Sequence, residues 1–168
     1  MPASKPVEIC FVCLGNICRS PLAEGVFQDL VNREGLESRI LVHSAGTGNW
    51  HVGAPPDARM QATAQTHGIR LQSIARQFQP EDFKRYQLIL PMDQSNLTTL
   101  KYMGSPRDMA TKVKLFRSFD PGHNGDLDVP DPYYGGSAGF QQVFDIVQRT
   151  CPHLLEFIKR EFLNSNEG

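Results

Sequence analysis

The spacing of apolar residues changes near the start of the chain, between two segments that a short loop joins. Val7 to Cys13 is an apolar run rich in Val, Ile and Phe, which is typical of a strand buried on both faces of a sheet. From Ser20 onward, apolar residues recur at the spacing of a helix, with Pro21 in its first turn and Gly35 at its end. The loop between these segments therefore connects a strand to a helix N-terminus.

The same alternation continues along the chain. Strands are expected at 39–45, 87–92 and 113–116, and helices at 58–67, 95–103 and 139–150. The order predicts an α/β fold, in which a doubly wound, four-stranded parallel sheet carries helices on both faces. Ligands bind such sheets beyond the carboxyl ends of the strands. Pro152 should kink or restart the last helix, and residues 154–163 are expected to pack as a second segment.

Two loops have compositions that exclude regular structure over most of their length. Residues 46–53 are rich in glycine and carry Trp50. Residues 120–137 read DPGHNGDLDVPDPYYGGS, with prolines and glycines throughout. Loops as long as the second one are usually functional or disordered in compact domains, so it is a candidate for part of a site.

Length and charge narrow the class of protein. The 168 residues are 40% hydrophobic and 21% charged, which indicates a single domain over 1–168, with flexible ends at 1–6 and 164–168. A formal net charge of -1 gives no bulk positive field for nucleic acid or an acidic membrane. The first apolar stretch is too short to span a membrane and lacks the cleavage pattern of a signal peptide. We therefore expect a cytoplasmic protein.

The cysteines do not form a disulfide scaffold. Cys10, Cys13, Cys18 and Cys151 are too few for that in a chain of this length, so free thiols are expected. A structural zinc site needs closely spaced ligand pairs, and the five histidines supply none, so no metal site is predicted. Cys10 and Cys13 would point to opposite faces of a strand, which excludes a redox pair and makes Cys10 a core residue.

Residues 12–21 read VCLGNICRSP and have the properties of an anion site. Cys13 lies at the bottom of a loop whose backbone amides converge at a helix N-terminus, where a phosphate fits. Those amides and the helix dipole also favour the thiolate, so Cys13 is expected to be nucleophilic. Arg19 can hold two phosphate oxygens through its planar guanidinium, and Gly15 permits the backbone to turn its amides inward. The loop predicts cysteine-based chemistry on a phosphate.

The stretch CLGNICRSP resembles the phosphate-binding loop of the low-molecular-weight protein tyrosine phosphatase family. Counterparts of further segments follow in the same order: VHSAGT (42–47), NWHVG (49–53), HGI (67–69), ARQ (75–77), MDQSNL (92–97) and DPYYG (131–135). A Cys and an Arg at this spacing are moderately specific, and the distant DPYY makes the resemblance strong. It implies a flavodoxin-like fold of the phosphotyrosine phosphatase I type.

The resemblance also implies a reaction that needs neither metal nor cofactor. Cys13 attacks phosphorus to form a cysteinyl-phosphate, while Arg19 and the loop amides hold the equatorial oxygens. Asp131 protonates the departing phenolate and then activates the water that hydrolyses the intermediate. Ser20 is placed to donate a hydrogen bond to the thiolate, which makes sulfur a better leaving group in the second step. Its competing role is to cap the helix, and both roles can hold together. Small aryl phosphates are expected to react as well.

Residues around the loop are assigned supporting roles by the same resemblance. Asn16 and Ser44 brace the loop through side-chain hydrogen bonds. Animal members of the family often continue this network to a histidine, and the matching position here is Ser73. Cys18 is either a small buried residue or a thiol that traps oxidised Cys13 as a disulfide; we favour the second because both sulfurs lie on one loop.

The choice of substrate is expected to depend on the rim of the pocket. The walls of a slot deep enough for a phosphorylated aromatic ring are resembled by Leu14, Trp50, Tyr133 and Tyr134. Phosphoserine is shorter, so in such a slot its phosphorus would stay out of reach of Cys13. Bacterial relatives that act on phosphoarginine tend to have threonine at the position of Ile17, so Ile17 favours phosphotyrosine. The implied partners are phosphotyrosine proteins, with inorganic phosphate as product and inhibitor, and the protein is expected to be a monomer.

Two other classes of function are alternatives to a phosphatase for this sequence. Thiol-dependent arsenate reductases resemble the fold, but they relay a disulfide through further cysteines, and residues 79–92 contain none. A phosphotyrosine-binding module or a cysteine phosphocarrier could use the same loop. Neither needs an acid for a leaving group, so the presence of Asp131 argues against both.

Overall fold

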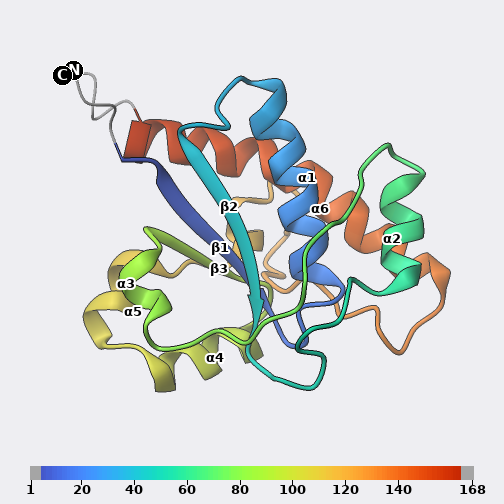
Figure 1. The fold of residues 1–168 in the computed structure, drawn as a ribbon, viewed down its shortest axis with the longest axis horizontal. Helices are drawn as coiled ribbons and strands as arrows, with labels where there is room; N and C mark the ends of the chain where they lie inside the picture. Colours follow the sequence, from blue (N-terminus) through green and yellow to red (C-terminus); the bar gives the residue numbers. More distant parts are fainter. Residues whose placement is uncertain (1–4, 164–168) are drawn as a thin grey trace.

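The computed structural model describes residues 5–163 (Figure 1). Its elements are β1 (Val7–Cys13), α1 (Arg19–Arg33), β2 (Ile40–Gly46), α2 (Ala58–Gln65), α3 (Asp82–Arg85), β3 (Leu88–Pro91), α4 (Gln94–Met103), α5 (Pro106–Lys112), the 3-10 helix η1 (Phe116–Phe119), α6 (Ser137–Ile158) and the π-helical turn η2 (Lys159–Leu163). Most of the two ends predicted to be flexible, residues 1–4 and 164–168, lies outside the described residues. Within 5–163, no helix is both long and apolar enough to cross a membrane.

The sheet is parallel, with the strand order β2-β1-β3. β1 is its central strand, and all its residues except Glu8 are buried, which explains the unbroken apolar run. Val7 pairs with Ile40 and Cys13 with Gly46, so β1 and β2 end together. Cys13 therefore lies at the carboxyl edge of the sheet, where ligands of such folds bind.

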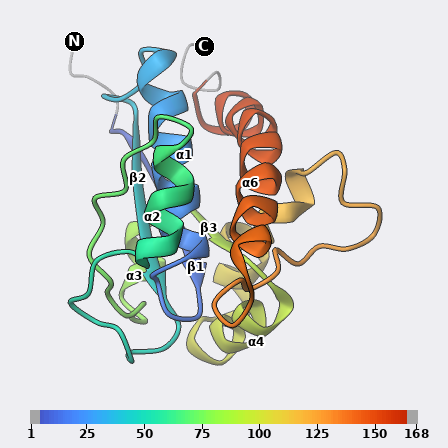
Figure 2. The ribbon, with the colours of Figure 1, turned by 90° about the vertical axis from the view of Figure 1, so that its right-hand side faces the viewer.

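Helices cover both faces of the sheet. On one face, α1 lies beside α6 (Figure 2), and Phe11 of β1 packs edge-on against Phe27 of α1 and Phe116 of η1. On the other face, Cys10 and Val12 join a separate apolar cluster that includes residues of α3 and α4. Cys10 is thus a core residue, as its position in the strand predicted.

The fourth strand predicted at residues 113–116 is wrong. Val113 makes an isolated bridge to Ile89, supported by one hydrogen bond from the amide of Lys114 to the carbonyl of Ile89 at 3.0 Å. The chain then turns into η1, where Phe116 is fully buried against Phe11. Burial of this aromatic ring takes the segment away from the sheet edge, and within residues 5–163 the sheet has three strands.

The restart of the helix predicted at Pro152 is also wrong. α6 continues through Pro152 to Ile158 without a break. Pro152 is exposed, whereas Cys151, Leu154 and Leu155 beside it are buried in the core. Burial of apolar residues on both sides of the proline therefore holds the helix together despite the missing hydrogen bond.

Replacing this proline is expected to stabilise the protein. Pro152→Ala restores an amide donor for the carbonyl of Gln148 and relieves the crowding between them, while it loosens the unfolded chain slightly. We expect the free energy of unfolding to rise by about 1–2 kcal/mol, measured by urea unfolding followed by circular dichroism. His153→Ala, at the exposed neighbouring position, is the control and should change it by about 0.5 kcal/mol or less. An unchanged or lower unfolding midpoint in Pro152→Ala would contradict this account.

Candidate active site

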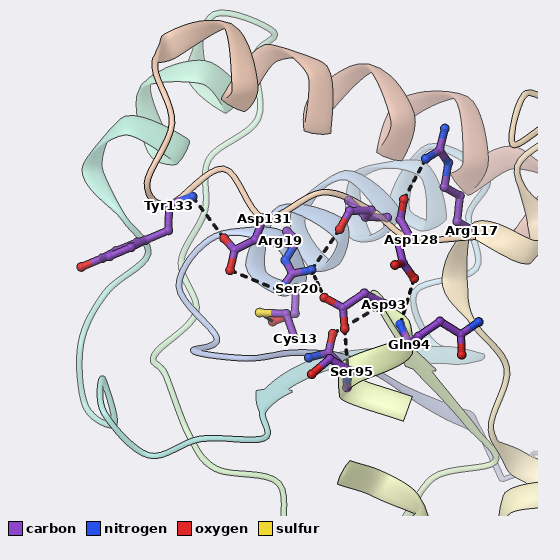
Figure 3. A network of polar contacts seen from close by, with 12 residues as sticks. Cys13, Arg19, Ser20, Asp93, Gln94, Ser95, Arg117, Asp128, Asp131 and Tyr133 are labelled. Atoms are coloured by element: carbon purple, nitrogen blue, oxygen red, sulfur yellow. Dashed lines mark hydrogen bonds and ion pairs between the residues drawn. The ribbon is translucent and has the colours of Figure 1, made fainter. Parts of the chain in front are cut away.

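The site lies where β1 ends and α1 begins. Cys13 is the last residue of β1, and Arg19 is the first residue of α1, so the loop between them encloses the carboxyl edge of the sheet (Figure 3). A cavity of about 370 Å³ opens above this loop. It is lined by Cys13, Leu14, Gly15, Ile17, Cys18, Arg19, Trp50, His51, Asp131, Tyr133 and Tyr134. The cavity therefore brings together the predicted nucleophile, arginine, acid and rim residues.

The turn of the loop differs in detail from the expectation for Gly15. The left-handed residue is Asn16, with φ of 56°, a conformation that asparagine tolerates better than most residues. At Gly15 the absence of a side chain leaves room for the His51 ring, because a Cβ atom there would lie 3.0 Å from that ring. Gly46 has the same role beneath the loop, where a Cβ atom would lie 2.8 Å from the carbonyl oxygen of Leu14. Close packing on both sides thus fixes the loop.

The sulfur of Cys13 is surrounded by hydrogen-bond donors. The thiol is buried, and the backbone amide of Asn16 donates to Sγ at 3.3 Å. Ser20 Oγ lies 3.0 Å from the same sulfur. Because Ser20 Oγ accepts from the Asn16 side-chain amide at 2.8 Å, its own proton is left for the sulfur at 3.0 Å or for the carbonyl of Ala45 at 3.5 Å, and the sulfur is the nearer acceptor. Both contacts favour a negatively charged sulfur.

A second set of hydrogen bonds braces Asn16 from below. Its amide also donates to Ser44 Oγ at 3.0 Å, and its carbonyl oxygen accepts from the backbone amide of Arg76 at 3.0 Å. The Ser44 hydroxyl donates to the carboxylate of Glu24, whose pKa burial raises although this hydrogen bond opposes the effect. Ser73 Oγ is buried without a hydrogen-bond partner among the described residues. The network therefore ends at Glu24, not at the position where the family often has a histidine.

Arg19 is a buried cation that contacts two carboxylates. Its side chain is 3% exposed, and Nη1 lies 2.6 Å from Asp93 Oδ2 while Nη2 lies 3.5 Å from Asp131 Oδ2. Nη1 also donates to the carbonyl oxygen of Val129 at 2.9 Å. Burial alone would lower the pKa of Arg19, but nearby Cys13, Asp93 and Asp131 raise it above the ordinary value. The guanidinium is therefore charged at every relevant pH.

Asp131 lies at the mouth of the cavity. Its side chain is 37% exposed, Oδ1 accepts a hydrogen bond from the backbone amide of Tyr133 at 3.1 Å, and Oδ2 faces Arg19. Figure 3 shows this carboxylate and the sulfur of Cys13 close to Arg19. An acid at this place can exchange a proton with a group held above the sulfur and still reach water.

Aromatic side chains form the rim. Trp50 is 70% exposed and Tyr134 95% exposed, and both border the cavity together with Leu14. The Tyr133 ring lies 4.9 Å from the Tyr134 ring and 5.9 Å from His51. Such walls accommodate a flat ring whose polar end points into the cavity.

Ile17 and Cys18 are both buried and line the lower part of the cavity. Burial raises the pKa of the Cys18 thiol, and the nearby charges of Asp57 and Cys13 raise it further. Cys18 is therefore held as a neutral thiol. Both are free cysteines.

Sequence reasoning missed three residues of the site: Asp93, Glu24 and His51. Asp93 follows β3 almost directly and caps α4, accepting from the Asn96 amide at 2.8 Å; an acid after a strand end was a usable signal. Glu24 lies one helical turn after Ser20, but nothing in the spacing indicates that it reaches Ser44. Between residues 5 and 163, no cluster of three His, Cys, Asp or Glu side chains could hold a metal ion.

Comparisons with known proteins agree with this geometry. The family model described as low molecular weight phosphotyrosine protein phosphatase matches residues 8–164. A low molecular weight protein-tyrosine-phosphatase of Streptomyces coelicolor is 44% identical over 155 residues, covering 92% of this chain and 94% of that protein. A low molecular weight phosphotyrosine protein phosphatase of Gallus gallus is 41% identical over 157 residues, covering 93% and 98%.

A solved structure matches a similar share of this chain. The crystal structure of a protein tyrosine phosphatase from Entamoeba histolytica, with Hepes in its active site, superposes with a TM-score of 0.87 at 34% identity. The match covers 92% of this chain and 97% of that one. With sequence, fold and cavity in agreement, this chain belongs to the low molecular weight phosphotyrosine protein phosphatase family.

Proposed function

We propose that the cavity hydrolyses phosphotyrosine in proteins with Cys13 as nucleophile, Arg19 as the phosphate clamp and Asp131 as the acid. The observation that carries the proposal is the meeting of these three side chains in one cavity, the sulfur buried at its base and the carboxylate at its mouth. Family membership supports the class of reaction, because members of this family are phosphotyrosine phosphatases.

In the first step, the Cys13 thiolate attacks phosphorus and the bond from phosphorus to the phenolic oxygen breaks. Asp131 gives its proton to that oxygen, so tyrosine leaves as a neutral phenol. Arg19 and the amides of the loop hold the three equatorial oxygens, whose charge is spread in the transition state. The products are a cysteinyl-phosphate and the Asp131 carboxylate.

In the second step, water takes the place of the phenol. Asp131 accepts a proton from the water as its oxygen bonds to phosphorus, and the bond from sulfur to phosphorus breaks. Sulfur leaves as a thiolate, which the Ser20 hydroxyl at 3.0 Å and the Asn16 amide stabilise. Inorganic phosphate is released, and because it fits the same loop it is also expected to inhibit.

The rim supports an aryl phosphate as substrate. Leu14, Trp50, Tyr133 and Tyr134 raise walls around the loop, and a phosphorylated phenyl ring is long enough to span them. Phosphoserine is shorter, so its phosphorus would stop above Cys13. Ile17, an apolar residue in the lower part of the cavity, favours phosphotyrosine over phosphoarginine.

We extend the proposal to the chain as a whole: residues 1–168 act as one phosphatase domain, as a monomer in the cytoplasm. One apolar cluster that includes residues of both α1 and α6 supports a single domain. Free Cys10, Cys13, Cys18 and Cys151 suit a reducing compartment. The formal net charge of -1 offers no general attraction to nucleic acid or to an anionic membrane, so protein substrates are the partners we propose.

Turnover of p-nitrophenyl phosphate tests the nucleophile and the acid. Cys13→Ser should lose activity by a factor of at least about 10⁴, because a hydroxyl does not ionise here, and a chelator should leave wild-type activity unchanged. Asp131→Ala should lower kcat by a factor of about 10²–10⁴. Asp145→Ala on the surface of α6 and Cys151→Ala in the core are matched controls and should keep activity. Wild-type turnover by Cys13→Ser would exclude the mechanism.

Ser20→Ala tests the departure of sulfur in the second step. Loss of one hydrogen bond to a charged sulfur costs about 1.5–3 kcal/mol, so kcat should fall by a factor of about 10–100. Because release of phenol comes first, stopped-flow recording should show a burst of nitrophenol followed by slow turnover. Ser95→Ala, an exposed serine of α4, is the control. If Ser20→Ala slows the burst itself and leaves no separate slow phase, this role is incorrect.

Recovery from peroxide tests Cys18. Peroxide converts the Cys13 thiolate to a sulfenic acid, which condenses with the Cys18 thiol to a disulfide and water. This oxidation also removes the Cys13 charge that raises the pKa of Cys18. Wild type should recover most of its activity with a dithiol, whereas Cys18→Ser should recover several-fold less because Cys13 is oxidised irreversibly. Cys151→Ala should behave as wild type, and equal recovery by Cys18→Ser would disprove the role.

A further inference from the structure

The loop that carries Asp131 is tied at two points to one arginine. Arg117, in η1, donates from Nε to Asp120 Oδ2 at 3.1 Å, where the loop begins. Its Nη1 donates to the backbone carbonyl of Asp128 at 2.7 Å and lies 3.4 Å from Asp126 Oδ2. The Arg117 side chain is 11% exposed and that of Asp120 is fully buried, so this contact is desolvated, whereas Asp126 is exposed to solvent. Arg117 thus bridges the two ends of the segment 120–128.

The first attachment is a buried carboxylate with two guanidinium partners. The Asp120 side chain is fully buried, and Arg149 of α6 binds it through Nε at 2.7 Å and Nη2 at 2.8 Å. The hydrogen bonds from Arg149, together with those from Gly122 and Arg117, hold the pKa of Asp120 well below its ordinary value. Asp120 is therefore a fixed anion from which Arg117 can reach the far end of the loop.

The second attachment lies immediately before the catalytic acid. Asp128 Oδ1 accepts from the amide of Gln94 at 2.9 Å (Figure 3). The amide of Val129 donates to the carbonyl of Met92 at 2.8 Å. The Val129 side chain is fully buried. These contacts fix the backbone where the loop comes back to the sheet.

Two prolines transmit that position to the acid. Asp131 stands between Pro130 and Pro132, and each proline ring fixes its own φ angle. The residue before a proline is held in an extended conformation, which applies to Val129 and to Asp131 itself. Because these backbone angles are restricted, a displacement of the Asp128 backbone should displace the Asp131 carboxylate by a similar amount.

We propose that Arg117 is a positioning residue for the acid: by holding the carbonyl of Asp128 against Asp120, it sets the Asp131 carboxylate over the leaving oxygen. The inference rests on the proposed role of Asp131. Arg117 is not among the residues that line the cavity. It contacts neither Cys13 nor Arg19 directly, although Arg19 binds the carbonyl of Val129, next to Asp128. Because Nη1 of Arg19 is also anchored by Asp93, we expect the main effect in the step in which a proton must reach the phenolate.

The dependence of kcat/KM on the leaving group separates this role from a general loss of structure. This parameter contains the expulsion of the phenolate, which needs the acid most when the phenol is weakly acidic. We would compare phenyl phosphate with 2,4-dinitrophenyl phosphate. Arg117→Met, which keeps the apolar stem, should lower kcat/KM about tenfold for phenyl phosphate and less than about twofold for the dinitrophenyl ester, because a small misplacement forfeits part of the acid's contribution.

Arg149→Met is the matched control, because it removes the other partner of Asp120 and leaves the contact of Arg117 with Asp128 in place. It should lower the unfolding midpoint but affect both esters equally. In an Asp131→Ala background, Arg117→Met should no longer discriminate between the esters. Arg117→Lys keeps a charge but lacks the fork that reaches both attachments, so it should show a weaker form of the same discrimination.

The outcomes are distinguishable. If Asp131→Ala itself leaves the two esters equally affected, the proposed acid is wrong, and the inference falls with it. If Asp131→Ala discriminates but Arg117→Met affects both esters equally, or matches Arg149→Met, the positioning role alone is overturned. Where Arg117→Met does not fold, Arg117→Lys carries the test, and a wild-type ratio of the two esters in that variant overturns the proposal.

Discussion

The buried guanidinium of Arg19 joins three segments that are distant in sequence. It starts α1 behind the cysteine loop, it binds Asp93 at the start of α4, and it binds Val129 and Asp131 in the long loop. A cation that is 3% exposed is stable only when its donors are paired, because desolvation costs several kcal/mol. Satisfying Arg19 therefore places the acid and the end of β3 around the sulfur.

In the proposed mechanism the same arginine also binds a phosphate, and its contacts differ in a way that allows this. Nη1 is held by Asp93 at 2.6 Å and by Val129 at 2.9 Å, whereas Nη2 meets Asp131 at 3.5 Å. The longest contact is the weakest, and it is the one on the cavity side. One half of the guanidinium thus supports the fold, and the other half can turn to an anion at small cost.

The sequence predicted local features well and distant contacts poorly. The change from an apolar strand to a helix indicated that Cys13 and Arg19 lie at one end of the sheet. The DPYY segment indicated Asp131. Both signals come from residues that are close together in the sequence. Helix α5 was missed because none of its residues is buried, so no apolar period reveals it; Ser105 and Pro106 at its start were the available signal. The partners of Arg19 lie 74 or more residues away, at separations that no local period encodes. Arg117 contacts Asp120 at the i, i+3 spacing of a helix, but its bond to the carbonyl of Asp128, 11 residues away, has no such signal.

The direction of the hydrogen bonds beneath the sulfur also follows from a distant contact. The backbone amide of Arg76 can only donate, so it fixes the side-chain carbonyl of Asn16 and turns the NH₂ group toward the two serines. Both serine oxygens then accept from Asn16, which leaves each hydroxyl proton for another acceptor. The Ser44 proton goes to Glu24, and the Ser20 proton has Cys13 Sγ at 3.0 Å as its nearest acceptor, with the carbonyl of Ala45 at 3.5 Å. An ordinary main-chain amide, sixty residues beyond Asn16, thus orients the hydrogen bonds beneath Cys13.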